Sequence, residues 1–294
     1  MLKSLDLSRK VPKADYKKAK DKLDLELGVL QRRARAAGVP VLVVFEGFNA
    51  AGKGTLINEL ILPLDPRGFR VTSFLPPNEE EALRPFLWRF WMRTPAGGRI
   101  AIFDRSWYRR VLGDRVDGRI AGADLAEAFE DIRCFERQLA DGGVVIVKFF
   151  LHISQAEQKR RFAKLRRSPA TAWRVTKDDL RRHKQYKQYV AAVEEALAET
   201  DAEHAPWTVV GAHAVRGATL KIFRAVASAL RQGVAAARRA SKPRRARAEA
   251  PAEAGASVLA TVDLSPSLKR AAYAPRLKKA QRRLRELEHE IYIR

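Results

Sequence analysis

The chain of 294 residues contains one cysteine, Cys134, and therefore cannot form an internal disulfide. It lacks any apolar run of the roughly 18–20 residues that a membrane-spanning helix needs. Its first residues, MLKSLDLSRK, have no apolar stretch typical of a secretory signal. Low cysteine use is typical of proteins in a reducing compartment. We therefore expect a cytoplasmic protein with no membrane partner.

Acidic residues are scarce relative to basic ones. The chain has 34 Asp and Glu residues against 57 Lys and Arg residues, which gives a formal net charge of +23. Because such an excess repels itself, it usually indicates an anionic partner. Nucleic acid is the commonest such partner, but a phosphate polymer or a highly charged nucleotide would serve equally. Charge alone does not choose between them.

Apolar, β-branched runs alternate with longer segments of helical periodicity. This alternation predicts an α/β fold with a parallel sheet covered by helices on both faces. The runs expected to form strands are residues 39–45, 69–74, 99–104, 144–151 and 207–210. The segments expected to form helices include residues 13–37, 79–92, 124–139, 155–164, 177–199 and 216–231.

The composition changes after the last of these helices. Residues 232–257 consist mostly of Ala, Arg, Pro, Glu and Ser, which is typical of a linker. Residues 258–294 then match the N-terminal helix in one register, pairing Asp6 with Asp263, Tyr16 with Tyr273, Lys22 with Lys279, Leu27 with Leu284 and Leu30 with Leu287. We interpret 1–231 as one domain and 258–294 as the first helix of a second, truncated repeat domain. The alternative is a shared composition of two charged helices.

A glycine-rich turn follows the first apolar run. The sequence Gly47-Phe-Asn-Ala-Ala-Gly-Lys-Gly-Thr55 lies between an expected strand and an expected helix. Glycines let backbone N–H groups surround an anion, and the helix directs its positive end there. The expected phosphate-binding residues are Gly47, Ala50, Ala51, Gly52, Gly54 and Thr55, with Lys53 contacting the transferred phosphoryl group. Gly54 stands where Ser or Thr normally holds magnesium, so Thr55 is the candidate replacement. A tightly packed turn that binds nothing is the alternative.

The third apolar run ends in Asp104-Arg105. A carboxylate at the carboxyl end of a strand beside a phosphate loop is a typical ligand of Mg²⁺. We therefore expect Asp104 to hold Mg²⁺, with Asn49 or Thr55 as further candidates, and Arg105 to bind phosphate. The structural alternative for Asp104 is a helix N-cap.

These motifs together resemble polyphosphate kinase family 2, which moves phosphoryl groups between inorganic polyphosphate and nucleotides. The resemblance rests on Gly47–Gly54 and Phe103-Asp-Arg-Ser-Trp-Tyr108, and extends to Trp173–Asp178 and Ala205–Thr208. It implies a three-layer α/β/α P-loop kinase fold with a helical lid at about residues 155–190. The apparent repeat resembles the tandem members associated with polyphosphate:AMP phosphotransfer.

The chain departs from the family pattern at two places. The family loop usually carries an aspartate where this chain has Asn49, which removes one negative charge from the expected catalytic group of Asn49, Lys53, Asp104 and Arg105. The segment 109–114 after Tyr108 also differs. In tandem members one half can be catalytically weakened, and these departures make this domain a candidate for that half.

Basic residues crowd the expected lid. Arg160, Lys164 and Arg167 share one helical face, with Arg161 beside them. Such close like charges repel unless an anion lies among them, so we expect them to bind polyphosphate. A solvated helix face is the alternative.

The resulting hypothesis is magnesium-dependent phosphoryl transfer between polyphosphate and a nucleoside mono- or diphosphate. AMP to ADP is the favoured reaction, with GMP or GDP as other substrates. Polyphosphate accounts for the basic charge, so nucleic acid is not the expected partner. Two alternatives stay open: an ATP-dependent nucleotide or metabolite kinase, and a catalytically weakened half that binds polyphosphate or nucleic acid. The sequence also leaves open whether the chain forms a homo-oligomer.

Overall fold

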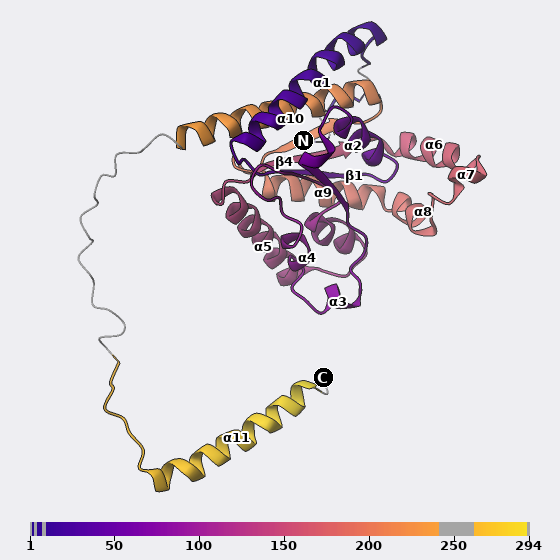
Figure 1. Cartoon of the computed structure of the whole chain (residues 1–294). Helices are drawn as coiled ribbons and strands as arrows, with labels where there is room; N and C mark the ends of the chain where they lie inside the picture. The colour runs from indigo at the N-terminus through magenta and orange to yellow at the C-terminus, as the bar shows by residue number, and fades with distance from the viewer. Residues whose placement is uncertain (1, 3–4, 8–9, 241–261, 293–294) are drawn as a thin grey trace. The chain divides into compact units, whose positions relative to one another are not determined.

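The computed structural model describes residues 2, 5–7, 10–240 and 262–292 (Figure 1). The chain divides into two units, Met1–Pro243 and Arg244–Arg294. In the described ranges no helix is both long and apolar enough to cross a membrane. The first unit contains the sheet and all the residues expected at the active site.

Five parallel strands form one sheet in the order β2-β3-β1-β4-β5. The central strand β1 is buried along its whole length, and β3 and β4 on either side are nearly so, as their continuous apolar sequences require. In this register Phe45 of β1 lies beside Asp104 of β3, so the ends of these strands meet at one edge. The strand bounds are β1 Val41–Gly47, β2 Phe69–Ser73, β3 Ile100–Asp104, β4 Val145–His152 and β5 Trp207–Gly211.

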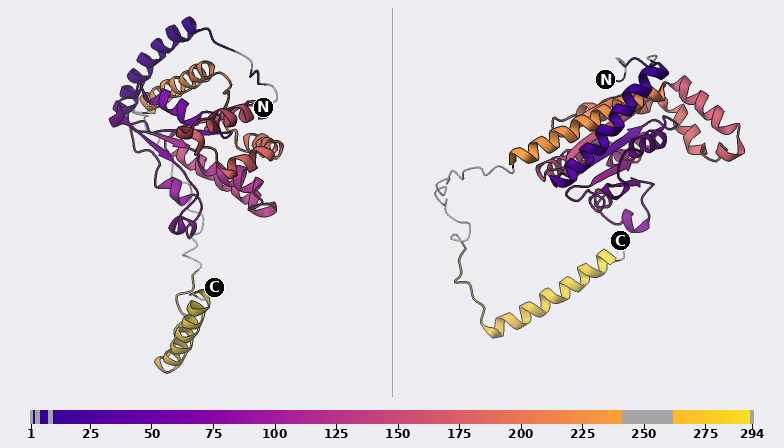
Figure 2. Two further views of the ribbon diagram at one scale, coloured as in Figure 1. Left: turned by 90° about the vertical axis from the view of Figure 1, so that its right-hand side faces the viewer. Right: turned by 45° about the horizontal axis from the view of Figure 1, so that its top comes forward.

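Helices cover both faces of the sheet (Figures 1 and 2). Helices α1, α2 and α10 lie on one face and α5 and α9 on the other, while α6, α7 and α8 project from one end. The helix bounds are α1 Lys13–Ala36, α2 Lys53–Ile61, α3 Glu79–Ala82, α4 Trp88–Trp91, α5 Gly122–Asp141, α6 Gln155–Arg166, α7 Pro169–Ala172, α8 Lys177–Lys184, α9 Tyr186–Thr200 and α10 Val215–Ala240. Three short helical segments complete this unit: η1 Pro66–Gly68, η2 Trp107–Arg109 and η3 Arg110–Asp114. The three-layer α/β/α arrangement expected from the sequence is confirmed.

Three helices differ from the sequence-based expectation. The single helix predicted over 79–92 is two short helices, α3 and α4, because Pro85 between them cannot donate a helical hydrogen bond. The helix predicted over 177–199 is interrupted at Gln185. Helix α10 continues to Ala240 and so includes the first nine residues assigned to the linker, 232–240. Gly233 and Val234 of that extension are buried, and the rest of the proposed linker lies outside the described residues.

The second unit contains helix α11, Arg270–Tyr292. Its Leu284 and Leu287 are exposed, whereas the matching Leu27 and Leu30 of α1 are buried in the first unit. The two helices therefore carry the same apolar positions, and α1 uses them to pack against α10. The expected start of the repeat, residues 258–261, and its last two residues lie outside the described ranges.

Candidate active site

The loop between β1 and α2 has the backbone geometry of a phosphate-binding turn. Gly47 has φ 141° and Gly52, at the helix N-cap, has φ 97°. A Cβ at Gly47 would lie 2.5 Å from the carbonyl oxygen of Leu151, so no side chain fits there. Ala50 is also left-handed, with φ 60°, a conformation that costs about 1–2 kcal/mol outside glycine. The loop thus brings backbone groups to the positive end of α2, where anions bind.

Lys53 begins helix α2 and turns back over this loop. Its Nζ donates to the carbonyl oxygen of Gly47 at 2.9 Å and approaches that of Phe48 at 3.4 Å. Burial, followed by the guanidinium of Arg105, lowers the pKa of Lys53 below its usual value. A bound phosphate would favour the charged form, so this ammonium group is poised for an anion.

Asp104 and Arg105 leave the end of β3 beside the loop. Arg105 has φ 67°, a second strained non-glycine residue at this edge. The helix N-cap is Ser106, whose side chain accepts from the backbone N–H of Tyr108, so Asp104 does not have the capping role considered above. Both residues face the groove in front of the loop.

The carboxylate of Asp104 suits a metal ligand. Its Oδ1 atom is buried and has no hydrogen-bond partner within the described part of the chain. Such a group is costly unless a ligand satisfies it, and carboxylate oxygens are preferred ligands of Mg²⁺. Thr55 also lines the groove and is exposed. No cluster of three or more His, Cys, Asp or Glu side chains forms a metal cage among the residues described. The carboxylate of Asp104 therefore has the chemistry and the free oxygen of a group that could hold Mg²⁺.

Asn49 is bound to the lid. Its Nδ2 donates to Oδ1 of Asp179 in α8 at 2.6 Å. Oδ2 of Asp179 accepts from the backbone N–H and the hydroxyl of Thr176, the N-cap of α8, and so completes a capping box at the start of this helix. One carboxylate therefore joins the start of the lid helix to the phosphate loop. This contact depends on the amide, because an aspartate at position 49 could not donate it.

A small polar pocket of about 30 Å³ lies next to the loop. It contains a carboxylate that the sequence analysis missed, Glu46, which accepts from the hydroxyl of Ser106 at 2.8 Å. Burial raises the pKa of Glu46 to about 7, although Lys53 and Ser106 oppose the shift. Four basic side chains line the pocket: Lys53, Arg105, Arg109 and Arg182. Glu46 could have been found in the sequence as a charged residue at the end of an otherwise apolar strand.

The lid cations have different surroundings. Arg161 is bound to the loop itself: its guanidinium donates to the carbonyl oxygens of Ala50 and Ala51, at 3.0 and 3.1 Å, and to that of Ala212 at 2.6 Å. Arg160 is paired with Glu157, and its hydrogen bond lowers the pKa of Glu157 to about 2. Lys164 lines the groove, whereas Arg167 is exposed and does not.

A groove of about 1400 Å³ runs from the phosphate loop to the lid. Residues 49–55 of the predicted loop line it, together with Asp104, Arg105, Arg160, Arg161 and Lys164. Gly47 lines the small pocket instead. Trp173 and Leu75 add apolar surface at its margin. The groove thus combines a cationic floor, a carboxylate and room for an extended anion.

Three comparisons place the first unit among known proteins. The sequence model of a family described as Polyphosphate kinase 2 (PPK2) matches residues 10–237. Polyphosphate:AMP phosphotransferase of Pseudomonas syringae pv. tomato is 39% identical over 235 residues, which are 80% of this chain and 47% of that protein. The chain thus spans about half the length of the polyphosphate:AMP phosphotransferases that it matches.

Relatives of more similar length also match. GDP-polyphosphate phosphotransferase of Mycolicibacterium smegmatis is 36% identical over 214 residues, which are 73% of this chain and 76% of that protein. The crystal structure of polyphosphate kinase 2 from Arthrobacter aurescens TC1 superposes with a TM-score of 0.76 at 32% identity. The superposed residues make up 79% of this chain and 85% of the Arthrobacter aurescens chain.

Proposed function

Since this chain belongs to the polyphosphate kinase 2 family, we propose that its first unit transfers a phosphoryl group between inorganic polyphosphate and a nucleoside mono- or diphosphate. AMP to ADP is the favoured reaction, because relatives at 39% identity are named polyphosphate:AMP phosphotransferases. The observation that supports it most is the convergence of Lys53, Asp104 and Arg105 on one groove.

Each residue has a role that follows from its position. Lys53 and the backbone of 47–54 hold the phosphoryl group in transit, and Arg105 neutralises charge on the oxygens around it. Bound through Asp104, Mg²⁺ would supply charge neutralisation of phosphate oxygens. Such a reaction depends on positioning and electrostatics, which these fixed groups supply.

The acceptor is tested by a direct assay. Polyphosphate and Mg²⁺ are incubated with AMP, ADP, GMP or GDP in turn, and the products are resolved by chromatography. We expect ADP from AMP as the fastest reaction. If ATP alone supports phosphorylation, the protein is instead an ATP-dependent nucleotide or metabolite kinase.

Asn49 favours a second candidate function, a catalytically weakened half that binds polyphosphate. Its amide is engaged by Asp179, and the carboxylate usual in the family is absent. We predict that Asn49→Asp raises turnover severalfold at saturating Mg²⁺, because it restores a negative charge beside the metal. Without Mg²⁺ the variant should melt at a lower temperature, since two carboxylates would then face each other.

The measurement is a paired titration of rate and melting temperature against Mg²⁺. Asn78→Asp is the matched control, because it makes the same substitution at the exposed N-cap of α3, outside the groove, where aspartate also caps a helix. A variant no faster than wild type at any Mg²⁺ concentration would show that Asn49 does not limit the reaction. Gly54 and the segment 109–114 would then be the next positions to change.

Polyphosphate binding should weaken steeply with salt, because several cations must displace counterions. In a plot of the logarithm of the binding constant against the logarithm of the salt concentration, Lys164→Glu should make the slope shallower. The change should be about one for each phosphate that Lys164 neutralises in wild type. Arg160→Glu should have a smaller effect, since Glu157 already pairs with Arg160. Arg166→Glu, on the same helix but outside the groove, is the control. Equal slopes in all three variants and wild type would mean that the lid cations are only a solvated face.

We also propose that residues 258–294 begin a second repeat of the domain. Helix α11 carries leucines at the positions that α1 buries against α10, and it leaves them exposed. A second domain of the same fold would supply the surface that covers them.

A further inference from the structure

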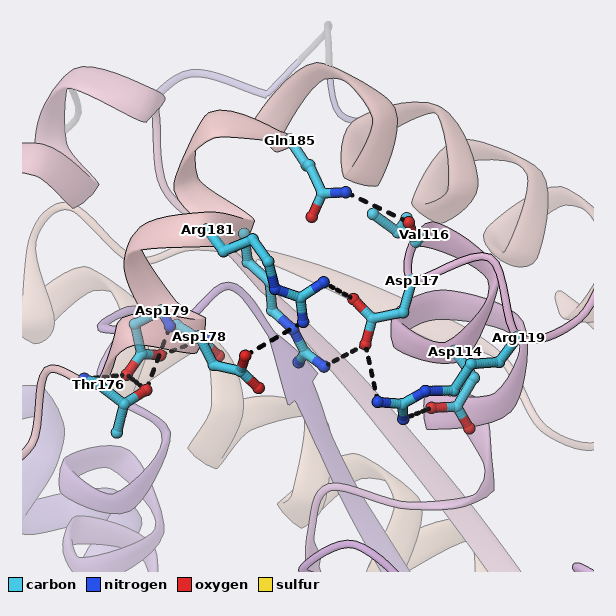
Figure 3. Close-up of polar contacts among 11 residues, drawn as sticks. Asp114, Val116, Asp117, Arg119, Thr176, Asp178, Asp179, Arg181 and Gln185 are labelled. Carbon is cyan, nitrogen blue, oxygen red and sulfur yellow. Dashed lines mark hydrogen bonds and ion pairs between the residues drawn. The ribbon is translucent and has the colours of Figure 1, made fainter.

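An acidic side chain outside the expected active site contacts the lid. Asp117 lies in the turn that follows η3, and its side chain is only 3% exposed. It is paired with Arg181 of α8 at 2.9 Å (Figure 3). It is also paired with Arg182 of the same helix at 3.0 Å. Arg119, from the same turn, approaches it at 3.7 Å. One buried carboxylate is thus surrounded by three guanidinium groups.

Helix α8 is held on two sides. At its N-terminus Asp179 accepts from Asn49 of the phosphate loop, and along its length Arg181 and Arg182 reach Asp117. Just beyond its C-terminus, Nε2 of Gln185 donates to the carbonyl oxygen of Val116 at 3.4 Å (Figure 3). The helix therefore bridges the phosphate loop and the turn after η3.

The charge balance makes Asp117 important to this arrangement. Burial opposes its ionisation, but Arg181 and Arg182 outweigh it and lower the pKa of Asp117. Arg182 also lines the small pocket with Lys53, Arg105 and Arg109. Without the carboxylate of Asp117, Arg182 would face three other cations in a pocket whose one carboxylate, Glu46, has its pKa raised to about 7. The excess positive charge would then push α8 away from the pocket.

We propose that Asp117 is a positioning residue that clasps α8 onto the site and holds Arg182 at the pocket before substrate binds. The lid is then already closed around part of the anion site, so less ordering remains when a phosphate chain binds. The clasp joins residues 65 positions apart in the sequence and is made by side chains alone. The consequence for polyphosphate rests on the proposed function, whereas the closure of α8 does not.

Hydrogen exchange tests the clasp without any substrate. In Asp117→Asn the amides of 177–184 should exchange about tenfold faster than in wild type, because α8 opens more often. Amides of β1 should keep their protection, which would show that the domain remains folded. Asp114→Asn is the control: it removes the same charge from the end of η3, three residues earlier, but Asp114 pairs only with Arg109 and Arg119 among the described residues. Equal exchange of α8 in wild type and Asp117→Asn would overturn the clasp.

Polyphosphate affinity provides a second test, because the clasp and simple charge removal predict changes in opposite directions. Removing a negative charge should by itself strengthen the binding of a polyanion. The clasp predicts the opposite for Asp117→Asn, about threefold weaker binding, while Asp114→Asn binds at least as tightly as wild type. Asp117→Glu, which keeps the charge, should recover most of the affinity. Tighter binding by Asp117→Asn would contradict the proposal. If wild type binds no polyphosphate, the proposed function fails, and the exchange measurement still decides the clasp.

Discussion

Replacing Lys53 by alanine is expected to lower the rate of nucleotide phosphorylation by about a hundredfold or more. Lys53 is the cation that starts α2, and its Nζ lies over the carbonyl oxygens of the phosphate loop. In phosphoryl transfer such a group offsets charge on the phosphate oxygens. The loop backbone should stay as it is, because Gly47 and Gly52 set its conformation.

The measurement combines an initial rate with a melting temperature. Lys53→Ala should melt close to wild type, since it removes a half-buried cation along with the hydrogen bonds of that cation. Lys159→Ala removes the same charge from an exposed position of α6 and should leave the rate unchanged within about twofold. If Lys53→Ala keeps the wild-type rate and melting temperature, Lys53 takes no part in the reaction.

Asp104→Ala should lower turnover by about as much as Lys53→Ala does. Unlike most substitutions, it should not destabilise the protein. Without Mg²⁺ the variant should be as stable as wild type or more so, because it removes a buried carboxylate oxygen that lacks a partner. With Mg²⁺ and a phosphate ligand, wild type should gain melting temperature by mass action and the variant should not.

A matched carboxylate keeps this experiment specific. The control is Asp131→Ala, which removes the same charge from an exposed position of α5. Asp131→Ala should keep both the turnover and the response to Mg²⁺. If Asp104→Ala responds to Mg²⁺ as wild type does, the metal is held elsewhere and Thr55 becomes the stronger candidate.

The sheet could be predicted closely from the sequence. The central strands β1, β3 and β4 are continuous apolar runs because they are buried on both faces. The edge strands β2 and β5 are partly exposed. All five lie within two residues of their expected bounds. The phosphate loop was predictable for a similar reason, since its glycines are needed at fixed backbone positions. Helix ends were less predictable. Helix α10 continues through an alanine- and arginine-rich segment, in which Gly233 packs closely against Val145.

The contacts that complete the site could not be read from sequence spacing. Asp179 reaches Asn49 across 130 residues and Asp117 reaches Arg182 across 65, so only the fold brings them together. The basic residues of the lid were visible as a group, but not their partners. Arg161 looked equivalent to Arg160 and Lys164 in the sequence, yet it binds the backbone of the phosphate loop.

We propose that this unit moves a phosphoryl group from polyphosphate to a nucleotide at the phosphate loop. The most direct test follows ADP formation and polyphosphate shortening together, in one reaction with AMP, polyphosphate of defined length and Mg²⁺. We expect one phosphate to leave the polymer for each ADP formed, and both signals to be lost in Lys53→Ala. Polymer that stays intact in the wild-type reaction while it remains bound to the protein would contradict the claim.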